Sequence, residues 1–224
     1  MITLSIDTSE HYCSAAIVNH EECLAKYSEN IGRGHAEKLL PTIKTLLTES
    51  NLEWADLKKI AVIVGPGTFT GLRIGLSVAR GLALSLKIPC IGVSGLECLA
   101  AQIPAYGTIH TCIAGRGETS YYQKFEKTEG GSLTATSEAA SLKNSDIVEK
   151  ISETTKTHII GSGASHIKKL TNIDQHTFIE QSCDTETLGY MAQSLSSTSN
   201  PANPHYLRAP DAVKAKPVFN FQTK

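Results

Sequence analysis

Hydrophobic and polar positions along the chain change period several times, and each change marks a predicted element. Three short runs rich in β-formers, at residues 2–7, 13–18 and 23–28, are separated by turn-like segments and predict a three-stranded meander. Apolar residues then recur at helical spacing over residues 35–50, which predicts an amphipathic helix. Pro41 falls inside that stretch, so we expect it in the first turns or at a kink.

Continuous apolar runs then alternate with helical stretches up to residue 101. Residues 59–64 and 88–93 predict two buried strands, and residues 71–86 and 94–101 predict the helices that follow them. The resulting order βββαβαβα is typical of a mixed sheet covered by helices.

The pattern restarts after residue 103 and predicts a second lobe. The strand-like runs are residues 108–114, 119–125 and 158–160, and the segment 128–145 is polar and predicts a loop with one short strand. Helical spacing returns at residues 185–195. We therefore expect an α/β protein of two lobes with mixed sheets flanked by helices. The predicted boundaries are 1–103 for the first lobe, 104–199 for a smaller second lobe, and 200–224 for a tail that packs back on the first.

Composition narrows the class of protein. Of 224 residues, 41% are hydrophobic and 19% are charged, which suits a globular chain and argues against disorder. The 21 Lys and Arg balance 22 Asp and Glu, which disfavours a protein that holds nucleic acid mainly by its own charge. Six cysteines without C-x-x-C spacing fit buried thiols in a reducing compartment. With no signal-like start and no long uninterrupted apolar run, we expect a cytoplasmic protein without a membrane span.

Two short polar loops are candidates for binding a nucleotide. Asp7, Thr8 and Ser9 end the first strand, and a carboxylate with two hydroxyls there could hold phosphates or a hydrated metal. A turn that satisfies its own backbone is the favoured alternative. Gly161, Ser162 and Gly163 follow a buried strand and could bracket the same nucleotide from the second lobe, although such turns are common.

The segment from Gly65 to Arg73 (GPGTFTGLR) is the most distinctive in the chain. It lacks the spacing of a Walker loop and of a dinucleotide-binding loop. Gly65, Pro66 and Gly67 predict a tight structural loop, and the helix that follows could present its N-terminus to an anion.

The helix after this loop has small residues on two stripes. One consists of Gly71, Gly75, Ala79 and Ala83, and the other of Ser77, Gly81 and Ser85. Each glycine inside a helix costs about 1 kcal/mol relative to alanine, so a close contact should offset it. The contact could be made with a partner protein or within the chain, and the pattern leaves both open.

No set of residues predicts catalysis. The eight histidines lack zinc-binding spacing, and no serine stands in G-x-S-x-G. We therefore predict no metal site and no catalytic residue.

The run GPGTFTGLRIGLSVARGLA (65–83) resembles the signature of the TsaB family, formerly called YeaZ. IDTS (6–9), HAEKLLP (35–41) and YLRAPDA (206–212) are similar to the family's opening strand, first helix and C-terminal motif. One segment departs: residues 113–120 (IAGRGETS) keep Gly-Glu but lack the acid and the aromatic residue that the family often has there.

The resemblance implies an actin-like ATPase fold of the ribonuclease-H-like type. It also implies a non-catalytic scaffold that pairs with TsaD, acts with TsaE, and serves the transfer of threonylcarbamoyl to the adenosine beside the tRNA anticodon. The chain would need no cofactor itself, although the complex could use ATP, and it would meet tRNA through the complex. A homodimer would use the same helices as TsaD. Those helices, 35–50 and 71–86, would contribute His35, Leu39, Ile43, Leu46, Gly71, Arg73, Ile74, Gly75, Val78, Ala79 and Leu82.

Two other functions stay open at this point. An ATP-dependent small-molecule kinase or ATPase of the same fold would need complete phosphate loops, and a peptidase would need a metal or a nucleophile. Nucleotide binding with turnover by the isolated protein would favour the kinase.

Overall fold

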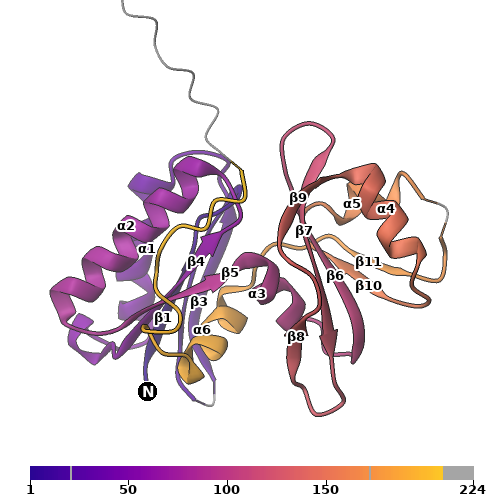
Figure 1. Cartoon of the computed structure of the whole chain (residues 1–224). Helices are drawn as coiled ribbons and strands as arrows, with labels where there is room; N and C mark the ends of the chain where they lie inside the picture. Colours follow the sequence, from indigo (N-terminus) through magenta and orange to yellow (C-terminus); the bar gives the residue numbers. More distant parts are fainter. Residues whose placement is uncertain (21, 172, 209–224) are drawn as a thin grey trace, which may run out of the picture.

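The computed structural model describes residues 1–20, 22–171 and 173–208, and these form two lobes side by side (Figure 1). Each lobe is built on one mixed sheet, and a buried layer joins the two sheets. The expected α/β class with two lobes of mixed sheets flanked by helices is confirmed.

The first sheet has five strands in the order β3-β2-β1-β4-β5. They are β1 (Thr3–Asp7), β2 (Tyr12–Val18), β3 (Cys23–Asn30), β4 (Lys59–Gly65) and β5 (Cys90–Ser94). β1, β2 and β3 pair antiparallel, which confirms the predicted meander, whereas β4 and β5 run parallel to β1. Helices α1 (His35–Glu49) and α2 (Phe69–Leu86) pack on this sheet. The short 3-10 turn η1 (Trp54–Asp56) precedes β4.

The second sheet has six strands in the order β11-β10-β6-β7-β8, with β9 also paired to β7. Its strands are β6 (Gly107–Ala114), β7 (Thr119–Lys127), β8 (Leu133–Ala135), β9 (Ala140–Lys143), β10 (His158–Ile160) and β11 (Thr177–Ile179). The remaining helices are α3 (Gly95–Ala101), α4 (Asn144–Ser152), α5 (Ala164–Lys168) and α6 (Thr185–Ser194). The polar segment 128–145 thus holds two short strands, where the sequence predicted one.

Alternate residues of each strand face opposite sides of its sheet, so each sheet can bury apolar side chains on both faces. Three apolar clusters form the core of the described residues. Leu4, Ile6 and Val62 face α1 and α2. Ile63 and Ala61 face the other way, into the cluster that α3 and α6 share with the second sheet. A third cluster lies under α4 and α5, around Ile147, Ile151 and Ile167.

Helix α6 belongs in space to the first lobe, which differs from the predicted boundary at residue 199. It packs on β1, β2 and β4, across the first sheet from α1 and α2 (Figure 1). The Lys59 ammonium, on β4, donates to the carbonyls of Ala192, Gln193 and Leu195 at 2.8, 2.9 and 2.9 Å. A cation that binds the last carbonyls of a helix also offsets its dipole, so this contact fixes the C-terminal end of α6.

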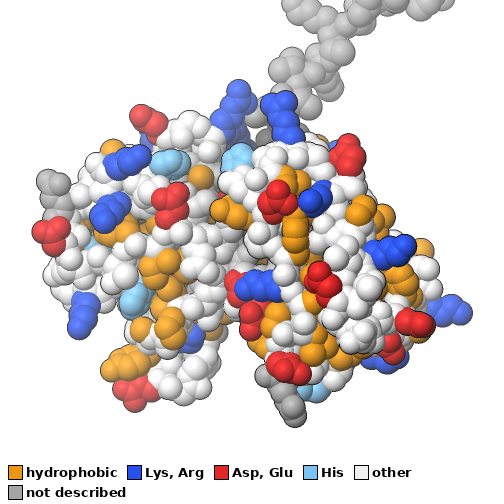
Figure 2. Space-filling view, turned by 180° about the vertical axis from the view of Figure 1, so that it is seen from behind, with side chains coloured by type: hydrophobic (Ala, Val, Ile, Leu, Met, Phe, Trp, Pro, Cys, Tyr) orange, Lys and Arg blue, Asp and Glu red, His pale blue; other side chains and the backbone are white. Residues whose placement is uncertain are grey.

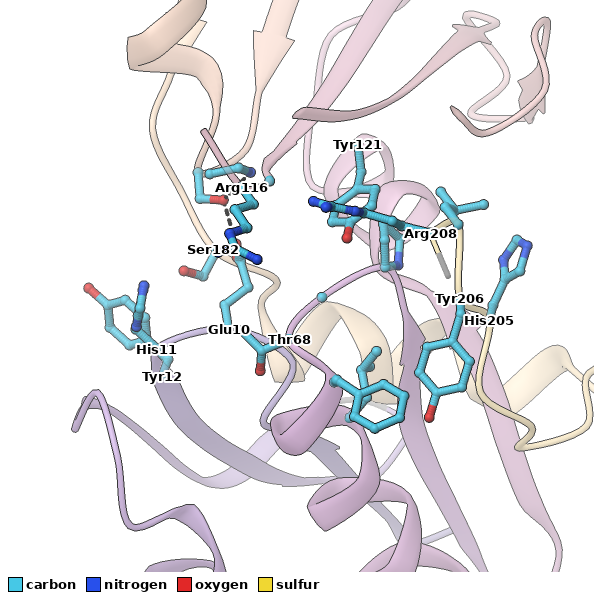
Figure 3. A pocket seen from close by; sticks show the side chains of 18 of the residues that line it. Glu10, His11, Tyr12, Thr68, Arg116, Tyr121, Ser182, His205, Tyr206 and Arg208 are labelled. Carbon is cyan, nitrogen blue, oxygen red and sulfur yellow. Dashed lines mark hydrogen bonds between the residues drawn. The ribbon is translucent and has the colours of Figure 1, made fainter. Parts of the chain in front are cut away.

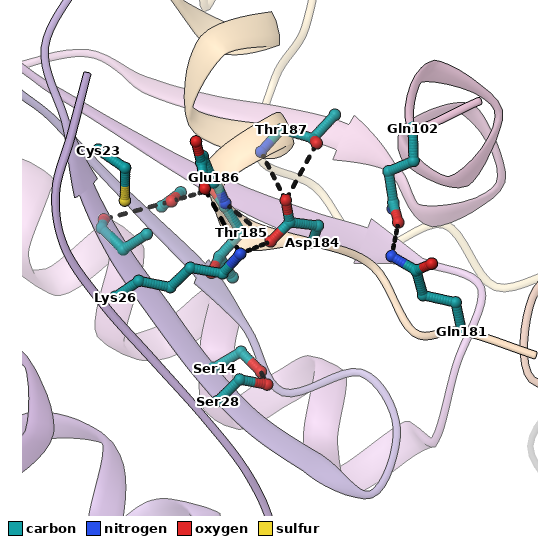
Figure 4. A network of polar contacts seen from close by, with 12 residues as sticks. Ser14, Cys23, Lys26, Ser28, Gln102, Gln181, Asp184, Thr185, Glu186 and Thr187 are labelled. Carbon is teal, nitrogen blue, oxygen red and sulfur yellow. Dashed lines mark hydrogen bonds and ion pairs between the residues drawn. The ribbon is translucent and has the colours of Figure 1, made fainter. Parts of the chain in front are cut away.

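The N-terminal end of α6 is fixed by polar contacts with β3 and β1 (Figure 4). Asp184 caps the helix and accepts a salt bridge from Lys26 at 2.5 Å. Ser5 donates to the carbonyl of Thr185 at 2.5 Å. Periodicity alone could not reveal this placement, because the contacts with Lys26 and Ser5 join residues more than 100 positions apart.

The described part of the tail lies along the first lobe. Pro201 bridges to Ile91 of β5, and the N–H of His205 donates to the carbonyl of Val64 at 2.8 Å. Among the described residues, α2 is one helix long and apolar enough to cross a membrane by length and composition. Its buried residues pack on the first sheet, and Arg73 and Arg80 lie on its exposed side, so here α2 is a covering helix.

The two small-residue stripes of α2 face opposite ways. Gly71 and Gly75 lie against Thr8, whose hydroxyl donates to the carbonyl of Gly71 at 2.8 Å. A Cβ at Gly75 would stand 2.6 Å from the Thr8 hydroxyl. A Cβ at Gly81, on the second stripe, would meet nothing within 4 Å. The first stripe therefore serves a contact within the chain, and the second faces solvent.

These two glycines give a matched test. Gly75→Ala should lower the free energy of unfolding by about 1–3 kcal/mol because the new methyl group overlaps Thr8. Gly81→Ala should raise it by about 0.5–1 kcal/mol because alanine is the better helix former and the space is open. Urea denaturation of both variants measures the difference. Equal effects of the two substitutions would contradict the assignment of the stripes.

Candidate functional site

A cavity of about 730 Å³ opens between the two lobes (Figure 3). It is lined from the first lobe by the β1–β2 turn, the start of α2 and the tail, and from the second lobe by the β6–β7 turn and the segments after β10 and β11. Its lining includes Glu10, Tyr12, Gly67, Thr68, Phe69, Arg116, Tyr121, Ser162, Tyr206 and Arg208.

The floor of the cavity is held by the contact between the β1–β2 turn and the Gly-Pro-Gly loop. The N–H of Thr68 donates to the carbonyl of Ser9 at 2.7 Å. A Cβ at Gly67 would stand 2.8 Å from the Cβ of Ser9. A side chain at Gly67 would therefore push the turn and the loop apart. Thr68 then caps α2 by accepting a hydrogen bond from the N–H of Gly71. The predicted structural role of Gly65, Pro66 and Gly67 is consistent with these contacts.

The first predicted nucleotide loop is closed on itself. Asp7, Thr8 and Ser9 are 3%, 2% and 1% exposed, and none of the three lines the cavity. Asp7 accepts the N–H of Ser9 at 2.8 Å, as in the Asx turn that the sequence favoured. Burial raises the pKa of Asp7 above its usual value, although the hydrogen bonds from Ser9 oppose that shift.

The second predicted loop contributes one residue to the cavity. Ser162 lines it, whereas Gly161 and Gly163 are buried against the carbonyl of Cys112 on β6. Gly161 has a φ of 127°, and the N–H of Gly163 donates to that carbonyl at 2.9 Å. The Gly-Ser-Gly turn therefore packs on its own sheet.

Glu10 joins the two loops, and sequence reasoning missed it. The Ser162 hydroxyl donates to the Glu10 carboxyl, and it also accepts the N–H of Ala114 at 3.0 Å. Burial raises the pKa of Glu10 to about 7, with a smaller contribution in the same direction from Asp7. One carboxyl thus links the lobes at the place where the two loops face each other.

Aromatic and arginine side chains surround the mouth. The Phe69 and Tyr206 rings lie 5.1 Å apart, and the Arg73 guanidinium stands 3.6 Å from the centre of the Phe69 ring. The Arg73 Nε also donates to the Tyr206 hydroxyl at 3.3 Å. Tyr206 begins the run YLRAPDA, but nothing in the spacing of that run indicated contact with α2. The part of that motif from residue 209 onward lies outside the described residues.

Comparison with known proteins identifies the family. The family model described as "TsaD: tRNA N6-adenosine threonylcarbamoyltransferase" matches residues 22–198. The chain is 33% identical over 157 residues to the tRNA threonylcarbamoyladenosine biosynthesis protein TsaB of Escherichia coli K12, covering 68% of this chain and 67% of that protein. The chain belongs to the TsaB (YeaZ) family.

Other relatives agree with this assignment over part of their length. The TsaB protein of Buchnera aphidicola subsp. Schizaphis graminum is 43% identical over 101 residues, which span 45% of this chain and 48% of that relative. The match therefore covers about half of this relative. A solved structure from Pseudomonas aeruginosa, described as an uncharacterized protein with similarity to peptidase YEAZ, superposes with a TM-score of 0.75 at 25% identity. The superposition covers 92% of this chain and 99% of the Pseudomonas aeruginosa chain.

The structure divides the interface predicted for this TsaB-family chain into inner and outer residues. The inner ones pack in the chain's own core and are buried: His35, Leu39, Ile43, Leu46, Gly71, Gly75 and Ala79. For these seven the prediction is wrong, because amphipathic spacing does not say which stripe meets the sheet. Arg73 is exposed, and Ile74, Val78 and Leu82 are half-buried, so these four lie nearer the outer surface.

No group of three or more metal-ligating side chains is found within residues 1–20, 22–171 and 173–208. Burial also raises the pKa of the Cys13 and Cys90 thiols to about 11, which lowers their reactivity at neutral pH.

The interlobe link makes stability depend on pH. The pKa of Glu10 is about 7 in the folded protein, and in an unfolded chain it is about 4.3. As pH rises the unfolded state ionises first, so Glu10 should lower the stability progressively between pH 4 and pH 7. Glu10→Gln, which carries no charge, should therefore be more stable than the unchanged protein by about 1–2 kcal/mol at pH 8. The difference is no larger because solvent screens part of the charge on this partly exposed side chain.

Chemical denaturation at a series of pH values measures this difference, which should vanish near pH 4 and level off above pH 7. A stability difference that is constant with pH would show that Glu10 does not titrate as its burial indicates.

Proposed function

We propose that the chain is a non-catalytic subunit in the biosynthesis of threonylcarbamoyladenosine in tRNA. The names of the curated relatives and the family model over residues 22–198 support the pathway. The buried Asp7-Thr8-Ser9 loop, in which Asp7 accepts the N–H of Ser9, supports the non-catalytic role, because an ATP-dependent enzyme of this fold would need that loop open to phosphate.

The outer face of α1 and α2 carries the proposal that the chain pairs with TsaD. We call it the outer helical face, and it consists of Leu40, Ser77, Gly81, Leu84 and Ser85. Leu84 is 82% exposed and Leu40 is 44% exposed. Gly81 lies on α2 one turn before Leu84, with open space where a Cβ would stand.

A glycine at that position is unfavourable in the isolated chain. It costs about 1 kcal/mol relative to alanine, and no contact within the described residues offsets it. Small residues beside exposed leucines allow another helix to approach closely and bury those leucines. A partner helix pair packed against α1 and α2 would provide this contact.

The same face would serve a homodimer, since two copies related by a two-fold axis can each present it. Homodimer and TsaD complex should therefore compete. TsaE would join the complex formed with TsaD, and ATP would be used by the complex and not by this chain. We place the protein in the cytoplasm, where the tRNA is modified.

One observation favours a second candidate, an ATP-dependent kinase or ATPase. The interlobe cavity of about 730 Å³ is within the range of small-molecule and cofactor sites. Tight ATP binding with turnover by the isolated protein would decide for it.

Exposed leucines in the two lobes provide a matched test of the interface. Leu84→Glu should weaken association with TsaD at least tenfold, because a charge would be buried at the centre of the contact. Leu170→Glu, at a 56% exposed position of the second lobe, should leave association unchanged. Calorimetric titration measures both affinities, and circular dichroism checks that both variants fold. The proposed interface is misplaced if Leu84→Glu binds TsaD as tightly as the unchanged chain.

The non-catalytic role has its own test. The isolated protein, supplied with threonylcarbamoyl adenylate and tRNA, should transfer no threonylcarbamoyl group above the rate without protein. Addition of TsaD and TsaE should start the transfer, as followed by mass spectrometry of the digested tRNA. Transfer by the isolated chain would refute the proposal.

A further inference from the structure

Aromatic rings stand around the interlobe cavity and remain partly open to solvent. Tyr12, Phe69 and Tyr206 line it from the first lobe and are 36%, 37% and 37% exposed. Tyr121 lines it from β7 of the second lobe (Figure 3). Large exposed rings are uncommon on a soluble surface, and a ring with one open face can stack on another planar group.

Arginines accompany these rings on both lobes. Arg116 and Arg208 line the cavity, and Arg73 lies over Phe69 at its edge. The N–H groups of Ile31 and Gly32 donate to the carbonyl of His11, which lines the cavity. Arg33 is the next residue along the chain. In the space-filling view, Lys and Arg side chains gather at the upper edge where the lobes meet (Figure 2).

The acids of the cavity offset these cations in part. Glu180 is exposed, and the Glu10 carboxyl is bound by Ser162. Burial raises the pKa of Glu10 to about 7, so it carries a partial charge near neutral pH. The lining itself holds two arginines and two glutamates, and Arg73 at its edge together with the partly neutral Glu10 leaves a modest excess of positive charge there.

Rings with arginines beside them fit an unpaired nucleotide strand. Bases stack on aromatic side chains while arginines meet successive phosphates, and paired bases cannot stack in this way. The Asp7-Thr8-Ser9 loop is buried away from the cavity, so the phosphate chain of a free nucleotide would not reach it. The arginines lie instead on both sides of the opening, as a strand running across it would require.

We infer that the mouth of the interlobe cavity, formed by Tyr12, Phe69, Tyr206, Arg73 and Arg116, contacts a single-stranded segment of RNA. This inference deepens the proposed function and rests on it for the identity of the RNA as tRNA. It gives the chain a part in holding the RNA substrate in addition to pairing with TsaD.

The expected strength of this contact is modest. Non-specific binding through a few arginines has a Kd of roughly 10⁻⁴–10⁻⁶ M at physiological salt. The isolated chain should therefore bind tRNA weakly, and the contact would matter when TsaD holds the same RNA, because linked sites raise the overall affinity.

The test uses the isolated full-length chain, so that its outcome does not depend on TsaD. The probe is a fluorescent single-stranded RNA of eight nucleotides, titrated at several salt concentrations. Tyr12→Leu removes a ring and Arg116→Ala removes a cation. Tyr106→Leu and Lys150→Ala are the matched controls, since Tyr106 is 66% exposed and Lys150 is exposed, and neither lines the cavity.

The inference predicts that Tyr12→Leu weakens binding by roughly tenfold through lost stacking. Arg116→Ala should reduce the slope of log K against log salt by about 0.7, the value for one phosphate contact on a single strand. The two control variants should bind like the unchanged protein, and RNA duplex of the same length should bind more weakly than the single strand.

Three outcomes would overturn the inference. One is equal weakening by the cavity and control variants. Another is duplex RNA binding as tightly as the single strand. The third is AMP or ATP displacing the probe at micromolar concentration, which would assign the cavity to a free nucleotide. Retained TsaD pairing alongside any of these would show that the proposed function stands without this contact.

Discussion

The contact between Thr8 and the first two turns of α2 determines most of the architecture around the cavity. The Thr8 hydroxyl donates to the carbonyl of Gly71, and Gly75 leaves room for that hydroxyl one turn later. This close approach brings the Gly-Pro-Gly loop under the β1–β2 turn and so forms the floor of the cavity. It also sets the rotation of α2 about its axis, which turns Gly81 and Leu84 toward solvent. A single packing constraint therefore connects the buried Asp7-Thr8-Ser9 loop with the outer helical face.

The two lobes are joined by contacts of different kinds. The apolar cluster around Ile63, Leu96 and Ile113 joins the sheets through α3 and α6. At the mouth, the link is the hydrogen bond between Ser162 and Glu10. The free energy gained by apolar burial does not depend on pH, whereas the charge of a carboxyl with a raised pKa changes near neutral pH. We therefore expect the mouth to be a part of the lobe interface whose stability depends on pH, and the aromatic rings lie there as well.

Much of the fold followed from periodicity. The antiparallel meander, the buried strands β4 and β5, and the helices α1 and α2 all have clear apolar spacing. The placement of α6 did not follow, because it depends on Lys59 reaching three carbonyls more than 130 positions away along the chain. The orientation of the stripes of α2 did not follow either, since Gly71 and Gly81 look alike in sequence and differ in what stands over them. Glu10 had no recognisable motif, and its role arises from a partner 152 positions away.

The outer helical face lies opposite the Thr8 contact, and we propose that a partner docks there. Hydroxyl-radical footprinting with mass spectrometry measures side-chain accessibility at this face directly. In the isolated chain, Leu84, Leu170 and Tyr106 should all be oxidised, since they are 82%, 56% and 66% exposed. On addition of TsaD, the account predicts strong protection of Leu84 and none of Leu170 or Tyr106. Unchanged oxidation of Leu84 in a complex that has demonstrably formed would contradict it.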